Sequence, residues 1–227
     1  PNTRANKINV MNRYRQYKKL PTGMLFELGE ITKSDIQLHR KLKHKQNHDL
    51  LPSYEVLMEE LGKQHKENYF MNYCYAVLGM RNQDINCLYK SRVDKNWVPN
   101  ENTIIFNPRA KRPKMTMHVV DYKTAQVYGP KKLELTDARL FEELCAMQLK
   151  HNDYIFATRS GGKPTLNHMN VKAMQMSLFG LGEGRIAKVL IKHCIDSGDH
   201  TRVSEISKAR GTAMQTLYSH YNTYDQS

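Results

Sequence analysis

Four residues that lie far apart in the chain, Arg81, Lys123, Arg185 and Tyr218, are of types that could act together on a phosphodiester. Arginine side chains are always charged and present a planar set of N–H donors that suits the non-bridging oxygens of a phosphate. A lysine can give a proton to a leaving oxygen, and a tyrosine phenol can be a nucleophile once the phosphate is neutralised. Singly, each residue also has an ordinary structural role, so the prediction depends on elements that bring the four together.

Arg81 is predicted to follow a buried helix. Residues 69–78 are almost wholly apolar, and Gly79 then loosens the backbone. Apolar residues at helical spacing predict a second, amphipathic helix over 82–93. Arg81 is therefore expected beside a helix start, where the backbone N–H groups and the helix dipole also favour an anion.

Lys123 falls in the β-rich part of the sequence. Strands are expected at 102–108, 115–124 and 131–135, with Lys123 near the end of the second strand. A helix over 136–149 follows, with Thr136 as its expected N-cap. A short apolar strand beginning at residue 153, a Gly-Gly turn and a helix after Asn167 are expected next.

The last part of the sequence is predicted to be helical and to carry the other two candidates. Arg185 starts an amphipathic helix over 182–198. Two short helices follow at 201–209 and 212–222, and Tyr218 lies in the second turn of the last one. The fold class expected from this order is mainly α with a small antiparallel β-sheet, an α+β fold.

Charge and composition favour a polyanionic partner. The formal net charge is +13 and the isoelectric point is near 9.5, which makes nucleic acid the favoured partner. Residues 1–48 hold eleven Lys or Arg against three acidic residues and are expected to form a basic N-terminal arm or linker. Residues 49–227 are expected to form one domain that carries all four candidate residues.

Several classes of protein and site are not expected. No apolar run approaches the roughly 18 residues of a membrane span, and no signal peptide is visible, so the chain is expected to be intracellular, in the nucleus or cytoplasm with its target DNA. Four scattered cysteines without a CxxC pair suggest reduced thiols. The "SGGKP" stretch at 160–164 lacks the spacing of a nucleotide-binding loop, and no H-E-x-x-H motif occurs. Neither a metal nor a small-molecule cofactor is expected.

Four segments, in this order, resemble the catalytic domain of tyrosine recombinases of the phage-integrase type. "AVLGMRNQDINCLY" resembles the first arginine box of the family, and "VVDYKTAQVYGPKKLELTD" resembles its β-hairpin with the lysine. "DYIFATRSGGKPTLNHMNV" resembles the stretch between the β-hairpin and the second arginine box of the family. "GRIAKVLIKHCIDSGDHTRVSEISKARGTAMQTLYSHYN" resembles the second arginine box running to the nucleophile. The resemblance extends from about Leu51 to Tyr221, roughly three quarters of the chain.

The resemblance implies a DNA strand-exchange enzyme, a site-specific recombinase or integrase, that acts on double-stranded DNA as a homo-tetramer. Tyr218 would attack the scissile phosphate to give a 3′-phosphotyrosine, Arg81 and Arg185 would stabilise the charge on the phosphate, and Lys123 would protonate the 5′-oxygen.

Two positions depart from the family pattern, and they keep other functions open. Gly182 and Ala209 stand where the family usually has His, or His or Trp, and the neighbouring Arg210 is a candidate accessory phosphate contact. The alternatives are a non-catalytic DNA-binding protein of the same fold and a type IB topoisomerase, which shares the chemistry.

Overall fold

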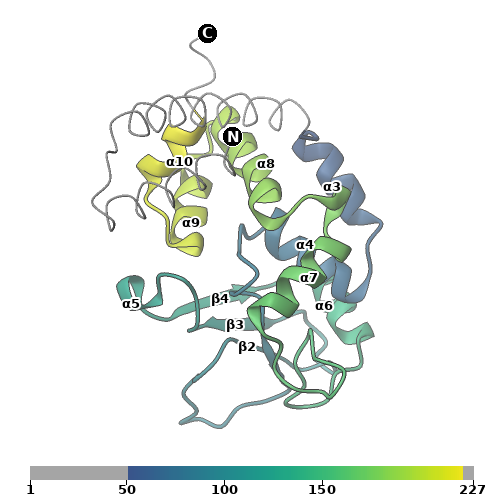
Figure 1. Cartoon of the computed structure of the whole chain (residues 1–227). Coiled ribbons are helices and arrows are strands. Elements are labelled where there is room, and N and C mark those ends of the chain that lie inside the picture. Colours follow the sequence, from purple (N-terminus) through teal and green to yellow (C-terminus); the bar gives the residue numbers. More distant parts are fainter. Residues whose placement is uncertain (1–50, 222–227) are drawn as a thin grey trace, which may run out of the picture. The chain divides into compact units, whose positions relative to one another are not determined.

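The computed structural model describes residues 51–221, with side chains as far as Tyr218, and every described element belongs to the unit that begins at Pro52 (Figure 1). The basic arm expected over 1–48 lies outside the described residues. The first part of the unit contains α3 (Tyr54–Gly62), α4 (Lys66–Ala76), β1 (Leu88–Lys90), β2 (Thr103–Phe106), β3 (Met115–Val119), α5 (Ala125–Tyr128) and β4 (Lys131–Leu135). The second part contains α6 (Ala138–Ala146), α7 (Leu166–Met176), the 3-10 helix η1 (Leu178–Gly180), α8 (Glu183–Asp196), α9 (His200–Arg210) and α10 (Met214–Tyr221).

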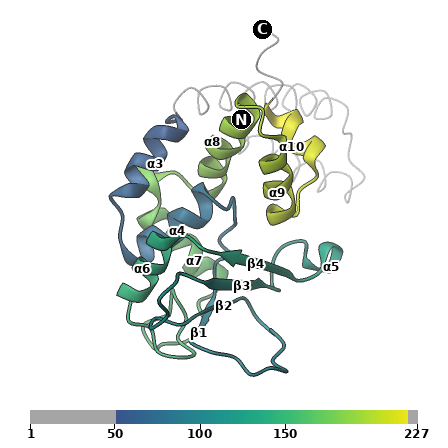
Figure 2. The ribbon, with the colours of Figure 1, turned by 180° about the vertical axis from the view of Figure 1, so that it is seen from behind.

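The predicted α+β class is confirmed, but the sheet is mixed rather than antiparallel. Its strand order is β1-β2-β3-β4, with β1 parallel to β2 and the other two pairs antiparallel. Alternate residues of β3 are buried, so one face of the sheet packs into the core. The ring of Phe106 on this face meets Phe141 of α6 edge-on, with centroids 6.1 Å apart. Figure 2 shows, from the opposite side, the sheet below α8, α9 and α10.

The helix expected over 82–93 was wrong: the segment forms a turn at its start and then strand β1. The buried Asn102 side chain explains the difference, because its amide nitrogen donates to the carbonyl oxygens of Gln83, Asp84 and Asp121. Its amide oxygen accepts the N–H groups of residues 120 and 121. These contacts come from a residue distant in sequence and hold the turn against the end of β3, which local periodicity does not record.

Helix α4 is the centre of the helical part. Its residues from Tyr69 to Ala76 are all buried, which confirms the predicted buried helix, and it contacts α3, α6, α7 and α8. A helix that is buried all round needs partners for its polar side chains. Asn72 finds them by donating to the carbonyl oxygens of Asn68 and Met176 and accepting the N–H of Leu178.

Helices α8, α9 and α10 pack around a small apolar cluster of their own. Two glycines with positive φ end the first two of these helices, Gly198 (φ +72°) after α8 and Gly211 (φ +57°) after α9. The left-handed conformation is easily adopted only by glycine, so these positions turn the chain twice within a short segment. The cluster consists of Leu190, Ile191, Cys194, Val203, Ile206 and Leu217.

Smaller expectations had mixed outcomes. The N-cap of helix α6 is one residue later than expected, because Asp137 rather than Thr136 caps it by accepting the N–H of Leu140. The short strand expected from residue 153 is reduced to an isolated bridge between Tyr154 and Leu88. All four cysteines are free, and all except Cys145 are buried. Within residues 51–221 no helix has both the length and the apolar character to cross a membrane.

Candidate functional site

Arg81 lies in a tight turn after α4, not at the expected helix start. Its backbone N–H donates to Oδ2 of Asp84 (3.1 Å), and the N–H of Asp84 returns to the Arg81 carbonyl oxygen (3.0 Å). Gly79, with φ +66°, redirects the chain just before this turn. The anion-binding helix terminus expected beside Arg81 is therefore absent from this place, and the turn positions the arginine instead.

The guanidinium of Arg81 is only partly satisfied. Nη2 donates to the Thr212 hydroxyl at 3.1 Å, whereas Nη1 is buried and has no hydrogen-bond partner. The hydroxyl of Thr124 is likewise buried without a partner, and it lies against Gly211, the residue before Thr212. A buried donor without a partner costs about 1–3 kcal/mol, and more when it is charged. Both polar groups lie beside the segment of Gly211 and Thr212 and are suited to donate to an acceptor such as a phosphate oxygen.

Arg210 reaches the same turn from the end of α9. Its Nη1 donates to the carbonyl oxygen of Gly79 (3.0 Å), and its Nη2 lies 3.8 Å from Oε1 of Glu183. The other carboxylate oxygen of Glu183 accepts the N–H of Asn82 at 2.5 Å. The C-terminal end of α9 and the N-terminal end of α8 therefore meet at the turn that carries Arg81.

Lys131, the first residue of β4, completes what we call the cation cluster: Arg81, Lys131 and Arg210. Its ammonium donates to the Ala209 carbonyl oxygen (2.8 Å) and lies 3.5 Å from the centroid of the Tyr122 ring. Burial lowers the pKa of Lys131 to about 8, the Arg81 charge adds to this effect, and Asp84 opposes it. A lysine of this kind is charged at neutral pH and yet can release its proton.

Two carboxylates accompany the cation cluster. Glu183 pairs with Arg210, and Asp84 is only 1% exposed. Burial raises the pKa of Asp84 to about 6, although the Arg81 N–H bond and the positive charges of Lys131 and Arg81 oppose the rise. Three cations thus meet two carboxylates, and the excess positive charge favours an anionic ligand.

Lys123, the lysine expected at the site, is exposed on the connection between β3 and α5. Sequence reasoning missed Lys131, although a signal for it existed. In "KKLEL" alternate side chains share a face, which puts Lys131 on the same side as Leu133 and Leu135. A lysine that shares a face with two leucines is a candidate for partial burial.

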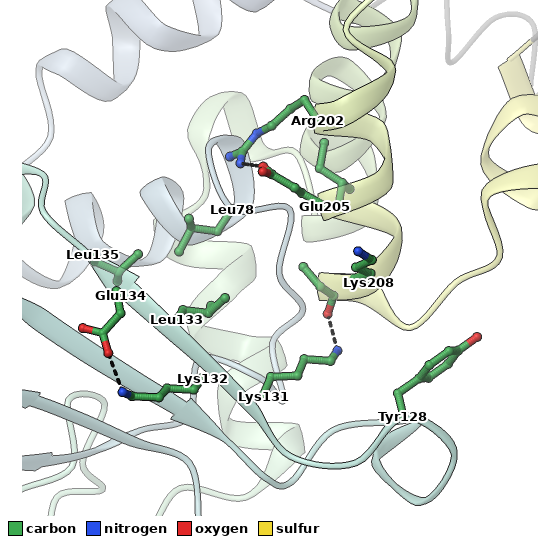
Figure 3. A pocket seen from close by; sticks show the side chains of 12 residues that line it. Leu78, Tyr128, Lys131, Lys132, Leu133, Glu134, Leu135, Arg202, Glu205 and Lys208 are labelled. Carbon is green, nitrogen blue, oxygen red and sulfur yellow. Dashed lines mark hydrogen bonds and ion pairs between the residues drawn. The ribbon is translucent and has the colours of Figure 1, made fainter.

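A groove of about 670 Å³ lies between β4 and α9, next to the cation cluster (Figure 3). Lys131 belongs to both, and Figure 3 shows its bond to the Ala209 carbonyl at one end of the groove. Lys132 pairs with Glu134, and Arg202 pairs with Glu205. The apolar lining residues are Leu78, Leu133, Leu135, Ile206 and Ala209.

Arg185 lies in the first turn of α8, as expected, two residues after Glu183. Its backbone is thus close to the cation cluster. Its charge, after burial, is the second cause that lowers the pKa of Lys188 on the next turn of the helix. The structure therefore gives Arg185 a place beside the cluster but brings Arg210 into direct contact with the Arg81 turn.

Tyr218 lies in the second turn of α10 and is away from the cation cluster. Its hydroxyl is 2.6 Å from Nδ1 of His200. His200 and Arg210 are the first and last residues of α9. Because an α-helix rises about 1.5 Å per residue, these two positions are about 15 Å apart. The structure joins Arg81, Lys131 and Arg210 at one end of α9 and holds Tyr218 at the other.

In residues 51–218, no three His, Cys, Asp or Glu side chains come together in a way that could hold a metal ion. No protein-family model matches the chain, and no curated protein matches it at a significant level.

Proposed function

We propose that the chain binds double-stranded DNA and cleaves and rejoins it through a phosphotyrosine, with the scissile phosphodiester at the cation cluster. The observation that carries the proposal is the guanidinium of Arg81, whose buried Nη1 lacks a partner in a cluster with excess positive charge. A non-bridging phosphate oxygen would supply the missing acceptor and balance that charge. The net charge of +13 supports a polyanionic partner of this kind.

The reaction would use a nucleophile, a proton donor and charge stabilisation. The phenolic oxygen of Tyr218 attacks phosphorus, its proton passes to solvent, and the bond from phosphorus to the 5′-oxygen breaks. The departing oxygen takes a proton from an ammonium group, leaving a 3′-phosphotyrosine and a free 5′-hydroxyl. Attack by a 5′-hydroxyl reverses the step, and the neutral amine takes its proton back. Arg81 and Arg210 stabilise the charge that develops on the non-bridging oxygens.

We assign the proton donor to Lys131, in place of the Lys123 expected from the resemblance. Lys131 contacts the segment that ends in Arg210, whereas Lys123 is exposed. A general acid works best when its pKa is near the working pH, and the pKa of Lys131 is about 8. Arg185 keeps a supporting role at the start of α8. A homo-tetramer on two DNA sites would complete strand exchange.

A second candidate function is DNA binding without cleavage. The observation that favours it is the position of Tyr218, whose hydroxyl contacts His200 at the far end of α9. A nucleophile has to approach phosphorus to about 3–3.5 Å with in-line geometry. If α10 does not move, the cation cluster can bind a phosphate but Tyr218 cannot attack it.

Covalent trapping separates the two functions. The full chain is incubated with duplex DNA nicked near the cleavage site, so that the short 5′-hydroxyl fragment diffuses away and the adduct accumulates. A denaturing gel then detects protein joined to DNA, and peptide mapping identifies the residue. We expect the adduct on Tyr218, and we expect Tyr218→Phe to abolish it while DNA affinity is unchanged.

Tyr221→Phe is the matched control, because Tyr221 lies about one helical turn after Tyr218 in α10. The side chain of Tyr221 and the whole of Tyr224 lie outside the described residues. This variant should still form the adduct. An adduct mapped to Tyr221 would refute the assignment of the nucleophile, and stable DNA binding without any adduct would favour the non-catalytic function. Formation of a branched junction from two labelled duplexes would distinguish a recombinase from a topoisomerase.

A further inference from the structure

The contact between Tyr218 and His200 is short and joins two exposed parts of the fold. The hydroxyl of Tyr218 lies 2.6 Å from Nδ1 of His200, and the ring centroids are 5.9 Å apart. His200 is exposed and follows Asp199, which caps α9 by accepting the N–H of Arg202. With the His200 proton on Nε2, the phenol donates to Nδ1. The cap and the preceding Gly198 turn fix the place of the imidazole, so the hydrogen bond fixes the phenol.

Among the described side chains of α10, only that of Leu217 is buried. Leu217 is buried in the apolar cluster of α8 and α9, while Met214 and Tyr218 pack against its border. The helix has eight residues, and isolated helices of this length are marginal in water. Its place therefore depends on docking, to which the bond from His200 contributes.

The start of the same segment covers the cation cluster. The Thr212 hydroxyl accepts a hydrogen bond from Nη2 of Arg81, the group proposed to bind phosphate. Thr212 is fixed to the last turns of α9, because its N–H donates to the Ser207 carbonyl oxygen and its own carbonyl accepts the Ser207 hydroxyl. The segment from Thr212 to Tyr218 thus occupies Arg81 at one end and holds the nucleophile at the other.

We infer that His200 is a positioning residue that holds Tyr218 in a resting place, with α10 docked on α8 and α9, and that DNA cleavage requires this hydrogen bond to break. We call this arrangement the α10 latch: Thr212 on Arg81 and Tyr218 on His200. The inference rests on the proposed function, in which Tyr218 attacks a phosphate at the cation cluster. Because His200 and Arg210 are the ends of an 11-residue helix, Tyr218 has to leave His200 to reach that phosphate.

The same contact has a second chemical interpretation, which the test must exclude. A histidine within hydrogen-bond reach of a nucleophile is often its general base. His200 would then have to accompany Tyr218 to the phosphate, yet it is the first residue of α9, whose other end is fixed to the cluster by Arg210. The two roles predict opposite effects, because removal of a base slows cleavage and removal of a latch accelerates it.

The test compares His200→Ala, His200→Asn and Thr201→Ala in the full chain. Asparagine can place an acceptor oxygen near the position of Nδ1, alanine cannot, and Thr201 is an exposed neighbour in α9 that serves as the control. The first measurement is backbone hydrogen exchange over residues 214–221 without DNA. The second is the single-turnover rate of adduct formation on nicked DNA. His200→Ala should raise both by about fivefold, the factor that one ordinary hydrogen bond contributes to an equilibrium. His200→Asn should restore wild-type values, and Thr201→Ala should leave them unchanged.

Each outcome decides the inference. Hydrogen exchange in α10 that does not change in His200→Ala overturns the latch, whatever the rate does. A slower adduct in His200→Ala with normal α10 exchange assigns His200 as the base and also overturns it. Faster exchange in His200→Ala that His200→Asn reverses, with no adduct in any variant, supports the latch and refutes the proposed cleavage. The inference and the proposed function can thus fail separately.

Discussion

The two ends of α9 differ in how their functional side chains are held. At the C-terminal end, Arg210 and Lys131 donate to main-chain carbonyl oxygens of Gly79 and Ala209, and Arg81 is fixed by its own turn. At the N-terminal end, one hydrogen bond joins His200 to Tyr218. The side chains at the C-terminal end are held by segments that are distant in sequence, whereas the position of Tyr218 depends on the docking of the short helix α10.

This difference separates the two tasks of the proposed reaction. Groups that stabilise developing charge act best when they are already in place before the reaction. A nucleophile that is kept away from the phosphate until the complex has formed does not cleave DNA prematurely. Segments with few buried contacts are the ones that move at low free-energy cost. We call the C-terminal end of α9, with Arg81, Lys131 and Arg210, the fixed end. The fixed end is therefore suited to phosphate binding, and the N-terminal end of α9 is suited to delivery of the nucleophile.

The largest expected effect is the loss of the proton donor at the fixed end. Lys131→Met should lower the rate of cleavage by about 10²–10⁴, the usual contribution of general acid catalysis, with a much smaller loss of DNA affinity. A substrate with sulfur in place of the bridging 5′-oxygen should restore the rate, because a thiolate leaves without a proton. The measurement is single-turnover adduct formation on both substrates.

Lys123→Met is the matched control, since Lys123 lies on the connection from β3 that leads to Lys131 but is exposed. It should leave the cleavage rate close to that of the wild type. If Lys123→Met is instead the variant that sulfur rescues, the expectation from the sequence was right and the assignment of Lys131 is wrong.

The next effect concerns the arginines. Arg81→Ala should reduce the cleavage rate by about 10²–10³, the cost of losing one preorganised donor in the transition state. The resemblance gives Arg185 the same role as Arg81, so Arg185→Ala would also lower cleavage by much more than it lowers DNA affinity. The structure lets the pair be compared with Arg210→Ala, because Arg210 contacts the segment that leads into the turn of Arg81. Arg210→Ala should lower the cleavage rate, relative to its loss of DNA affinity, by more than Arg185→Ala does. The reverse order would mean that Arg210 does not stabilise the phosphate.

The sequence predicted the helices better than the site. Residues 69–78 are almost wholly apolar, and residues 182–198 carry apolar side chains at helical spacing, so both helices were expected and found. The turn at Arg81 and strand β1 depend on Asn102, and no local pattern reports that contact. The alternation in "KKLEL" could have predicted the partial burial of Lys131, but Lys123 matched the lysine of the recombinase β-hairpin better. The contact of His200 with Tyr218 joins residues 18 positions apart and carries no sequence signal.

The pH dependence should separate function from stability at the fixed end. Lys131 loses its proton above its pKa of about 8, so the second-order rate of adduct formation should fall roughly tenfold per pH unit above that value. Stability should change in the opposite direction. Folding lowers the pKa of Lys131 from 10.5, so between pH 8 and 10.5 the unfolded chain binds more protons. The free energy of unfolding from this group therefore rises with pH in that window.

Asp84→Asn tests the cause of this profile. The negative charge of Asp84 raises the pKa of Lys131, so its removal should shift the fall in rate to lower pH. A profile that stays in place in Asp84→Asn, or that is the same in Lys131→Met, would show that another group titrates.

The last comparison concerns stability alone and uses a glycine at each end of α9. Gly211 and Gly198 both have positive φ, but a Cβ at Gly211 would lie 1.7 Å from Oγ1 of Thr124, whereas nothing lies within 4 Å of a Cβ at Gly198. Gly198→Ala should lower the free energy of unfolding by about 1–2 kcal/mol, the cost of left-handed backbone for an L-residue. Gly211→Ala should cost about 1–3 kcal/mol more, because the packed neighbours must also shift.

Urea unfolding measures both glycine variants, and Thr124→Ala provides the matched background. In that background the Oγ1 clash is absent and the closest contact is the one of 3.0 Å to the Cβ of residue 124, so Gly211→Ala should cost less than it does in the wild type. Equal costs in the wild-type background would mean that the turn between Arg210 and Thr212 yields as easily as the one before His200. The fixed end would then be no more rigid than the end that holds Tyr218, and the division of tasks between them would lose its physical basis.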